Sequence, residues 1–373
     1  MDVLISGASM AGLSAAWWFS RLGHRVTVVE RADGLRRGGA PIDVRGRALG
    51  TAERMGILAK IDAGKVTIVE PAPVLDGTGA QVATLDLRWF ANETDQDIEI
   101  SRDRLNNILL DALPDGVEFR FKASIASLAD GPRGVDVAFA DGRKARYDLV
   151  VGADGLHSKV RKLAFGPERD YVRHFGYYVA LVDLPAQREW RRGMLNVPGL
   201  TIAVRDAGDG PQGMMLAASP EIDYDYRDPE AQRRLIGQLI SRVDVWQVPA
   251  LRAAFIDPAA KGFYFDSVSQ THMPSWIKGK VAVIGDAGHC AALLSGMGTT
   301  LAMVSAETLA TTWTECDGDM GAASPVYHER LRPYVEQCQA FAHEGAPIMV
   351  PATQEALDAR NASFRACAER RGA

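Results

Sequence analysis

The chain has 373 residues, of which 47% are hydrophobic and 24% charged, as expected for a soluble globular protein with two or three domains. The net charge of −5 gives no overall positive field that would attract nucleic acid or an anionic membrane. The N-terminus lacks the basic stretch of a secretory signal, and the apolar stretch 13–19 is too short to span a membrane. The four cysteines form no Cys-x-x-Cys pair, so we expect no disulfide framework, no metal site and a cytoplasmic location.

The first half of the chain predicts alternating strands and helices. A strand over 2–6, a helix over 11–22 and a strand over 25–30 form a βαβ unit with short connections. A loop over 35–46 and a helix over 47–56 follow, and then strand-like runs within 66–85 that prolines and glycines interrupt. The remaining predicted elements are a strand over 98–101, a helix over 102–113, and strands over 117–121, 124–128, 135–139 and 145–151.

The second half changes character twice. Strand-like runs at 175–182, 201–204, 214–218 and 262–268 indicate a sheet-rich region, interrupted by one helix over 229–243. A buried strand over 280–284 then resembles the strands of the first half, and helices are predicted over 299–313, 326–341 and 353–368. We therefore expect an α/β nucleotide-binding domain that a second, sheet-rich domain interrupts.

The first motif is the glycine-rich turn between the first strand and the first helix. Gly7 suits the tight turn, Gly12 allows the helix to pack closely on the strand, and Ser9 is small enough for a phosphate to approach the backbone. Glu30 ends the second strand, where an acid accepts hydrogen bonds from a ribose diol. The motif predicts FAD or NAD rather than NADP; the alternative is a βα turn with incidental glycines.

Two further segments are characteristic when they follow such a turn. Residues 148–161 read Asp-Leu-Val-Val-Gly-Ala-Asp-Gly-Leu-His-Ser-Lys-Val-Arg, a strand, a polar turn and the start of a basic helix. Residues 285–298 begin with Gly-Asp after a buried strand and end with Gly-Met-Gly before a helix. Asp154 is either a cofactor-side residue or the N-cap of the following helix, and both roles are compatible.

With the three motifs in this order, the chain resembles the class A flavoprotein monooxygenases, the FAD-dependent aromatic hydroxylases of the para-hydroxybenzoate hydroxylase fold, which include tetracycline-inactivating enzymes. The resemblance extends to about Phe341. It implies an α/β fold in which a Rossmann-like FAD-binding domain of the glutathione reductase type is interleaved with a β-sheet substrate domain. The implied FAD-binding domain comprises 1–70, 98–170 and 276–320, the substrate domain 71–97 and 171–275, and a C-terminal helical segment 321–373.

The resemblance also implies which residues hold non-covalent FAD. Asp286 would bind ribityl hydroxyls, and the helix that begins near Thr299 would direct its positive end at the flavin ring. Arg102 would contact FAD, with Arg104 as the alternative in register, and Arg45 is either a flavin-side contact or a surface arginine. The full expected set is Gly7, Ser9, Met10, Ala11, Gly12, Glu30, Arg31, Arg45, Arg102, Asp154, Asp286, Gly296, Met297, Gly298 and Thr299.

Three residues depart from the family pattern in the flavin loop and the helix after it. Leu293 occupies a position that is usually proline, Thr300 replaces a common asparagine, and Ser305 replaces a common aspartate. These departures question the detailed loop conformation and any motion of the flavin ring.

The implied activity is hydroxylation of an aromatic or polyketide-like small molecule of secondary metabolism by NAD(P)H and O₂ through a flavin C4a-hydroperoxide. Because the cofactor carries this chemistry, the protein needs to orient the substrate and exclude water, and no catalytic side chain is certain. Candidates for a proton-transfer role are His289, which could equally be a positional loop residue, together with Tyr178 and His174. Whether NADH or NADPH is the reductant, and whether the chain is a monomer or a homodimer, is left open.

The expected substrate wall consists of aromatic and methionine side chains from the sheet-rich region. Each of them could instead be an ordinary core residue. The set is Phe175, Tyr177, Met214, Met215, Phe263 and Phe265. Two alternatives to hydroxylation are an FAD oxidase or dehydrogenase of the same fold, and a flavin- or ligand-binding protein without turnover.

Overall fold

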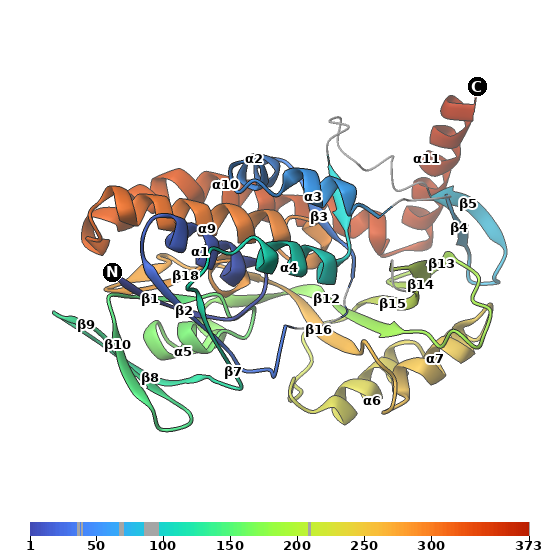
Figure 1. Cartoon of the computed structure of the whole chain (residues 1–373). Helices are drawn as coiled ribbons and strands as arrows, with labels where there is room; N and C mark the ends of the chain where they lie inside the picture. The colour runs from blue at the N-terminus through green and yellow to red at the C-terminus, as the bar shows by residue number, and fades with distance from the viewer. Residues whose placement is uncertain (36–37, 39, 67–70, 86–96, 208–209, 373) are drawn as a thin grey trace.

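The computed structural model describes residues 1–35, 38, 40–66, 71–85, 97–207 and 210–372, and two sheets organise it (Figure 1). A six-stranded sheet has the order β17-β18-β11-β1-β2-β7, and a seven-stranded sheet has the order β16-β12-β15-β14-β13-β4-β5. The fold is mixed α/β, as the sequence predicts. The boundaries expected near residues 70 and 97 adjoin 67–70 and 86–96, which lie outside the described residues.

The six-stranded sheet is parallel except for β17 at its edge. Its central strands are apolar runs that are buried on both faces, which is the usual pattern for a parallel sheet covered on both sides. Its strands are β1 (Asp2–Ser6), β2 (Arg25–Glu30), β7 (Glu118–Phe121), β11 (Leu149–Gly152), β17 (Ile277–Lys278) and β18 (Val281–Val283).

Helices cover one face of this sheet and a smaller sheet covers the other (Figure 1). The three-stranded sheet β10-β9-β8 and helix α5 lie on the second face. The covering helices are α1 (Met10–Arg21), α4 (Arg102–Asp111) and α9 (Gly298–Glu315), and the elements opposite are α5 (Lys159–Ala164), β8 (Ile125–Gly131), β9 (Gly134–Phe139) and β10 (Lys144–Tyr147).

The single strand predicted over 145–151 is two strands, β10 and β11, in different sheets. Asp148 lies between them, and its Oδ2 accepts a hydrogen bond of 2.7 Å from the backbone N–H of Asp2. This contact holds the chain where it leaves the small sheet and enters the parallel one, a change of direction that hydrophobic periodicity does not reveal.

The seven-stranded sheet receives β4 and β5 from early in the chain; β4 pairs with β13, and β5 pairs with β4 at the edge of the sheet. Its strands are β4 (Ala72–Leu75), β5 (Gln81–Leu85), β12 (Val172–Asp183), β13 (Gly193–Val197), β14 (Leu200–Asp206), β15 (Pro211–Ala218) and β16 (Tyr264–Thr271). Helices α6 (Pro229–Leu239) and α7 (Val248–Ile256) pack on one face, which we call the back face. The sequence analysis missed α7.

The opposite face, the front face, contacts the C-terminal helices and the loop before α9. Helix α10 (Met320–Met349) is longer than the predicted helix at both ends, and it contains Pro325, Pro333 and Pro347. Helix α11 (Gln354–Gly372) packs near β5 and β13. The remaining short elements are β3 (Ile42–Val44), β6 (Ile98–Ile100), α2 (Arg47–Arg54), α3 (Leu58–Ala63) and α8 (Asp286–His289).

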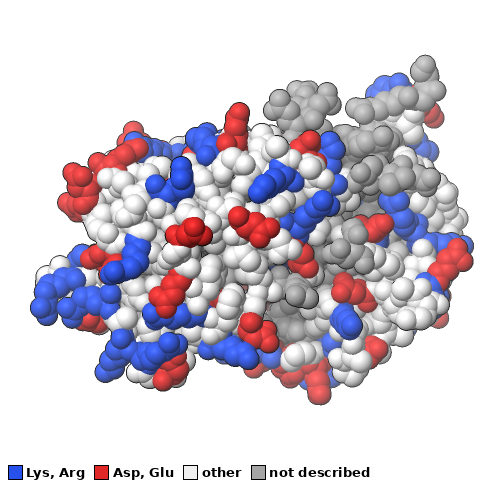
Figure 2. All heavy atoms as spheres, in the orientation of Figure 1, with Lys and Arg blue, Asp and Glu red and all other residues white. Residues whose placement is uncertain are grey.

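The surface carries charges of both signs. Figure 2 shows basic and acidic side chains interspersed over much of the face in view, in keeping with the small net charge. Among the described helices, none combines a bilayer-spanning length with a sufficiently apolar sequence. Within the described ranges, no group of three or more His, Cys, Asp and Glu side chains is placed to hold a metal ion.

Candidate active site

The three sequence motifs meet at the carboxyl ends of the parallel strands. Gly7 follows β1, Glu30 ends β2, Asp154 follows β11 and Asp286 follows β18. In open α/β sheets, ligands bind at this edge, where the strand order reverses around the first strand. The site is therefore built from segments that are far apart in the chain.

The glycines of the first turn are required by the packing of the backbone. A Cβ atom on Gly7 would lie 2.3 Å from the carbonyl oxygen of Ala153, and one on Gly12 would lie 1.9 Å from the carbonyl oxygen of Gly7. Gly7 also has a φ of 108°, which disfavours other residues. The turn is thereby wedged between β11 and α1, and no side chain covers the start of the helix at these positions.

The start of α1 is positively polarised. Ser9 is its N-cap, the first turn contains no acidic residue, and Met10 and Ala11 form its first buried residues. An Nη2–H of Arg102, at the start of α4, donates a hydrogen bond of 3.2 Å to Oγ of Ser9. A helix N-terminus and a guanidinium group thus meet at one point, which favours a phosphate group.

Glu30 is held beside this turn by backbone hydrogen bonds. Its two carboxylate oxygens accept from the N–H groups of Ala8, at 3.0 Å, and Ala32, at 2.9 Å. Arg31, which follows Glu30 in the chain, has an exposed side chain. The position of Glu30 at the end of β2 suits a ribose, whereas nothing in the structure points Arg31 toward the turn.

Asp154 stabilises the start of α5, although the N-cap of that helix is Ser158, whose Oγ accepts from the N–H of Arg161 at 3.0 Å. The Asp154 carboxylate accepts hydrogen bonds from the backbone N–H groups of Lys159, at 2.8 Å, and Val160, at 3.1 Å, and from Oγ of Ser158. Burial raises the pKa of this carboxyl, and the hydrogen bonds oppose that rise. The adjacent Gly155 has a φ of 81° and open space where a Cβ would be, so the turn can approach a ligand closely.

Arg161 joins this motif to the later one, although the sequence analysis did not include it among the site residues. Its side chain is fully buried, and it donates to the carbonyl oxygens of Ala287, at 2.9 Å, and Leu156, at 2.6 Å, and to Glu168, at 3.1 Å. The available signal was that this arginine ends the strand–turn–helix segment 148–161. Its function here is to fix two cofactor-side loops relative to each other.

Asp286 lies in a recess at the end of β18. Its side chain is exposed although its neighbours Gly285 and Ala287 are buried. Desolvation by the surrounding protein nevertheless raises the pKa of this carboxyl, while the nearby charge of Arg102 opposes the rise. A carboxyl that water reaches but that protein surrounds is available to accept hydrogen bonds from a ligand.

The loop before α9 opens onto free space. Gly296 has a φ of 66°, and a Cβ on Gly298 would meet no atom within 4 Å. Met297 is the N-cap residue, Thr299 is in the first turn, and that turn contains no acidic residue. The positive end of an 18-residue helix therefore points into an open region.

Two of the departures from the family pattern have clear structural roles. Thr300 donates through its hydroxyl to the carbonyl oxygen of Arg45 at 3.1 Å, and Oγ of Ser305 accepts from the N–H of Gly285 at 3.3 Å. Leu293 is 49% exposed. The loop also contains Ala292 at a φ of 72°, a strained conformation for a residue with a side chain.

Arg45 is an ion-paired residue beside this loop, not a free surface arginine. Its guanidinium lies 2.8 Å from Asp43 and 3.8 Å from Asp97. A Cβ on Gly296 would lie 3.3 Å from Nη1 of Arg45 and 3.4 Å from Oδ2 of Asp43. The ribbon formed by β3 and β6 therefore lies against the loop.

These features fit FAD. Two helix N-termini without acidic residues and Arg102 would hold the pyrophosphate and the negative edge of the flavin ring. Glu30 would bind the adenosine ribose and Asp286 the ribityl chain. Open space at Gly155 and Gly298 leaves room for an elongated dinucleotide along the edge of the sheet.

The expected substrate wall divides between the two faces of the seven-stranded sheet. Phe175, Tyr177 and Met214 lie on the front face, in a cluster with Ala292 and Leu294 of the loop before α9. The other three do not: Met215, Phe263 and Phe265 belong to the back-face core beneath α6 and α7. The expectation that these three residues line the substrate wall is therefore wrong. Successive side chains of a strand point to opposite faces of the sheet, so Met214 and its neighbour Met215 cannot line the same wall.

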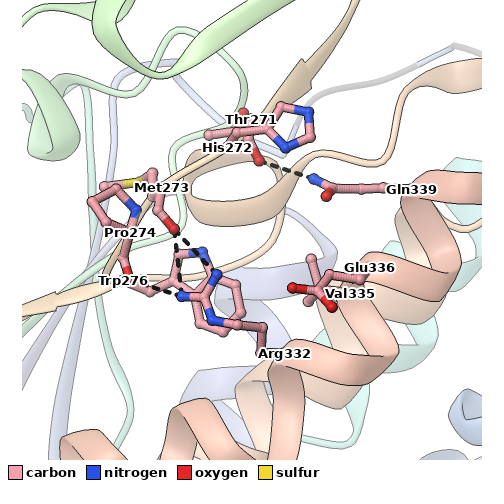
Figure 3. Close-up of a pocket in the computed structure, with 9 residues that line it drawn as sticks. All are labelled: Thr271, His272, Met273, Pro274, Trp276, Arg332, Val335, Glu336 and Gln339. Atoms are coloured by element: carbon pink, nitrogen blue, oxygen red, sulfur yellow. Dashed lines mark hydrogen bonds between the residues drawn. The ribbon is translucent and has the colours of Figure 1, made fainter.

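The candidate His289 is a buried structural residue. Its ring is fully buried, packs edge-on against Trp276 with centroids 5.2 Å apart, and neither ring nitrogen has a hydrogen-bond partner among the described residues. Burial lowers its pKa to about 3, so the ring is neutral. Trp276 also lines a cleft of about 200 Å³ between α10 and the segment after β16, where Arg332 lies over its ring (Figure 3).

The candidates His174 and Tyr178 are likewise engaged away from the front face. The ring nitrogens of His174 lie 2.6 Å from Oγ of Ser267 and 2.9 Å from the carbonyl oxygen of Ser219. The hydroxyl of Tyr178 accepts from the N–H of Ile222 at 2.7 Å, and its ring stacks on Phe265. Burial raises the pKa of this phenol, so the structure gives it no role as a base at neutral pH.

His157 is a charged residue that the sequence analysis passed over. Its ring stacks on Tyr226 at 3.8 Å, and its two nitrogens lie 2.9 Å from Glu168 and 3.3 Å from Asp266. Burial alone would lower its pKa, but the hydrogen bonds to Asp266 and Glu168 outweigh burial and raise the pKa to about 9. The imidazolium ties the motif after β11 to strand β16 of the other sheet.

Comparison with known proteins agrees with this geometry. The family described as "FAD binding domain" matches residues 1–193. An uncharacterized protein of Mycobacterium tuberculosis is 36% identical over 366 residues, covering 95% of this chain and 96% of the relative. A flavin-dependent monooxygenase of Legionella longbeachae is 31% identical over 345 residues, covering 91% of this chain and 87% of the relative.

Among solved structures, the tetracycline destructase Tet(51) superposes with a TM-score of 0.85 at 30% identity, over 98% of this chain and 95% of that one. The destructase Tet(55) gives 0.83 at 29% identity, over 97% and 94%. The similarity thus covers both sheets as well as the C-terminal helices. The chain belongs to the FAD-binding-domain family of flavin-dependent monooxygenases and is an FAD-dependent enzyme of that family.

Proposed function

We propose that the protein uses NADPH or NADH and O₂ to hydroxylate a flat aromatic or polyketide-like small molecule. The observation that supports this most directly is the front-face cluster, which contains Phe175, Tyr177 and Met214 together with Ala292 and Leu294 of the loop before α9. An apolar aromatic wall next to a flavin loop suits a planar substrate that must be kept away from bulk water. Bound FAD supplies the redox chemistry, accepting hydride from the reductant and activating oxygen.

The residues of the chain bind the cofactor, orient the substrate and shield both from bulk water. Arg102, Glu30 and Asp286 would hold the cofactor, and α9 would place its positive end at the flavin edge where negative charge develops on reduction. No proton-transfer residue forms part of this proposal, since His289 is fully buried and His174 and Tyr178 are hydrogen-bonded away from the front face. The proposal includes a cytoplasmic location, since all four cysteines are free thiols.

The test uses the purified protein reconstituted with FAD. NADPH and NADH oxidation is measured with a panel of phenols and polyketides, and tetracycline is the first probe because of the two structural relatives. Under ¹⁸O₂, the expected product carries one labelled oxygen, which mass spectrometry detects. Stimulated NAD(P)H oxidation whose products contain no labelled oxygen supports an oxidase or dehydrogenase instead, and absence of FAD binding overturns both.

A further inference from the structure

The ribbon beside the flavin loop holds two carboxylates directly opposite each other. Asp43 on β3 and Glu99 on β6 are paired residues of the antiparallel ribbon. Side chains in such positions share a face and lie about 5 Å apart, and like charges placed there destabilise the pairing. The facing carboxylates therefore do not stabilise the ribbon, and a destabilising charged pair of this kind is typical of a functional site.

Only one of the two carboxylates is neutralised. Arg45 pairs with Asp43 at 2.8 Å and approaches Asp97 at 3.8 Å. Glu99 has neither an ion pair nor a hydrogen bond through its carboxylate with any described residue. Burial and the charge of Asp43 raise the pKa of Glu99, and the charges of Arg205 and Arg45 oppose the rise.

On the seven-stranded sheet, Arg205 is a cation that, like Glu99, has no oppositely charged partner among the described residues. It lies near the end of β14, after residues 200–204, which are all buried. Its Nε and Nη2 donate to Oε1 of Gln212 at 3.2 and 2.8 Å, a neutral partner on the paired strand β15. Within the described residues, no carboxylate lies within ion-pair distance of the guanidinium, and burial lowers its pKa while Glu99 and then Asp43 oppose that effect.

Glu99 on the ribbon and Arg205 on the sheet lie close enough for each charge to act on the other. Gly296 of the flavin loop lies against Arg45 and Asp43, which places the ribbon beside the loop. On the sheet, the strand that carries Arg205 pairs its Ala203 with the front-face residue Met214. Glu99 and Arg205 are thus both placed on the substrate side of the flavin loop, and neither has an oppositely charged partner within ion-pair distance among the described residues.

We propose that Glu99 and Arg205 form a substrate-recognition pair for a planar aromatic or enolic molecule that carries an ionised oxygen near a hydrogen-bond donor. Arg205 binds the ionised oxygen, and Glu99 accepts the hydrogen bond from the donor. A wholly apolar substrate would leave both half-buried groups without an opposite charge or a further hydrogen bond, which is costly, whereas a guanidinium recognises a planar carboxylate or enolate through two N–H groups. The inference rests on the proposed function, because it assumes that the substrate lies beside the flavin loop.

The experiment measures binding rather than turnover. The FAD-reconstituted protein is titrated with an ortho-hydroxynaphthoate, with the corresponding neutral hydroxynaphthamide, and with the naphthoate that lacks the hydroxyl, and flavin absorbance reports binding. The native protein is expected to prefer the hydroxynaphthoate to its amide about tenfold or more, the usual effect of a charge-assisted hydrogen bond. Arg205→Gln is expected to abolish that preference, and Arg205→Lys to retain part of it.

The role of Glu99 is tested by comparing the hydroxynaphthoate with the naphthoate that lacks the hydroxyl group. Glu99→Gln is expected to bind the naphthoate at least as tightly as the native protein does, because a negative charge is removed, but to lose a several-fold preference for the hydroxylated compound. The control is Arg234→Gln. Arg234 belongs to helix α6 on the back face, and its side chain is 64% exposed, so the variant should bind all three compounds as the native protein does.

Three results overturn the proposal: no preference for the anion in the native protein, an unchanged preference in Arg205→Gln, or no binding of any of the three probes. The proposed function is judged separately, by FAD content and by labelled oxygen in the products. A protein that binds FAD and the naphthoate through Arg205 but transfers no oxygen retains the recognition pair and loses only the hydroxylation.

Discussion

An Nη1–H of Arg161 donates a hydrogen bond of 2.9 Å to the carbonyl oxygen of Ala287, across 126 positions of the chain. The contact joins the helix after the second motif to the turn that contains Asp286. The same guanidinium also holds Leu156 and Glu168, so one buried side chain sets the spacing of two cofactor-side loops. Loops arranged by a rigid scaffold are the usual way in which an α/β sheet presents its ligand contacts.

Replacing Arg161 with methionine should therefore weaken both folding and cofactor retention. The change leaves two backbone carbonyls without a donor and leaves the Glu168 carboxylate with His157 as its remaining partner, and we expect the free energy of unfolding to fall by about 3 kcal/mol. Chemical denaturation of the apoprotein, together with the FAD content of the purified variant, checks this. Arg146→Met is the matched control, since Arg146 and its partner Asp136 are exposed and their ion pair should contribute little to stability; equal losses in the two variants would contradict the assignment.

The two aspartates of the motifs should respond differently to alanine. Asp286→Ala removes a desolvated, exposed carboxyl, so we expect the variant to lose most of its FAD while the apoprotein stays at least as stable. Asp154→Ala removes the group that accepts from two N–H groups at the start of α5, so we expect the apoprotein to lose about 1–2 kcal/mol while part of the FAD is retained. Absorbance spectra and apoprotein melting curves separate the two; unchanged FAD content in Asp286→Ala is the outcome that rejects the assignment.

The sequence predicted the parallel sheet and its motifs because these depend on local signals. Gly7, Glu30 and Asp286 each follow or end a strand, and parallel strands bring their carboxyl ends to one edge. The front and back faces of the other sheet could not be assigned in the same way. Periodicity shows that Phe263 and Phe265 share a face, but not which face the flavin loop covers, and a shift of one residue reverses the answer.

Recognition of the charged groups required the tertiary structure. Glu99 and Arg205 come from different sheets, and each looks like an ordinary charge near the end of a short strand. Arg205 ends an apolar strand, a weak signal that becomes informative only when its partner proves to be the neutral Gln212. Long-range pairs of this kind depend on how two sheets pack, which no local pattern encodes.

The charge on His157 predicts a stability that falls as pH rises. Its pKa is raised from 6.5 to about 9 in the folded protein, because the hydrogen bonds to Asp266 and Glu168 outweigh burial. The stabilisation is therefore complete below pH 6.5 and is lost as the pH rises through about 9. Over that window the native protein should lose up to about 3 kcal/mol of unfolding free energy that a His157→Gln variant does not lose.

The measurement is the difference between the two proteins in urea denaturation at a series of pH values across this window. Groups common to both, such as the free thiols, cancel in the difference. We also expect His157→Gln to be less stable than the native protein at neutral pH, because Asp266 and Glu168 lose their cationic partner. A difference that is constant with pH would show that His157 is not charged in the folded protein.

The assignment of the two sheet faces predicts opposite effects for two aromatic residues on the neighbouring strands β12 and β16. Phe265 is 4% exposed and stacks on Tyr178 in the back-face core, so Phe265→Ala should cost about 3–5 kcal/mol of stability. Its effect on ligand affinity, measured on the folded fraction, should be small. Tyr177 is partly exposed on the front face beside the flavin loop, so Tyr177→Ala should cost less stability but change the affinity for planar ligands several-fold. Thermal melting and flavin-absorbance titrations of both variants test the pair, and ligand affinity that depends on Phe265 but not on Tyr177 would place the substrate on the other face of the sheet.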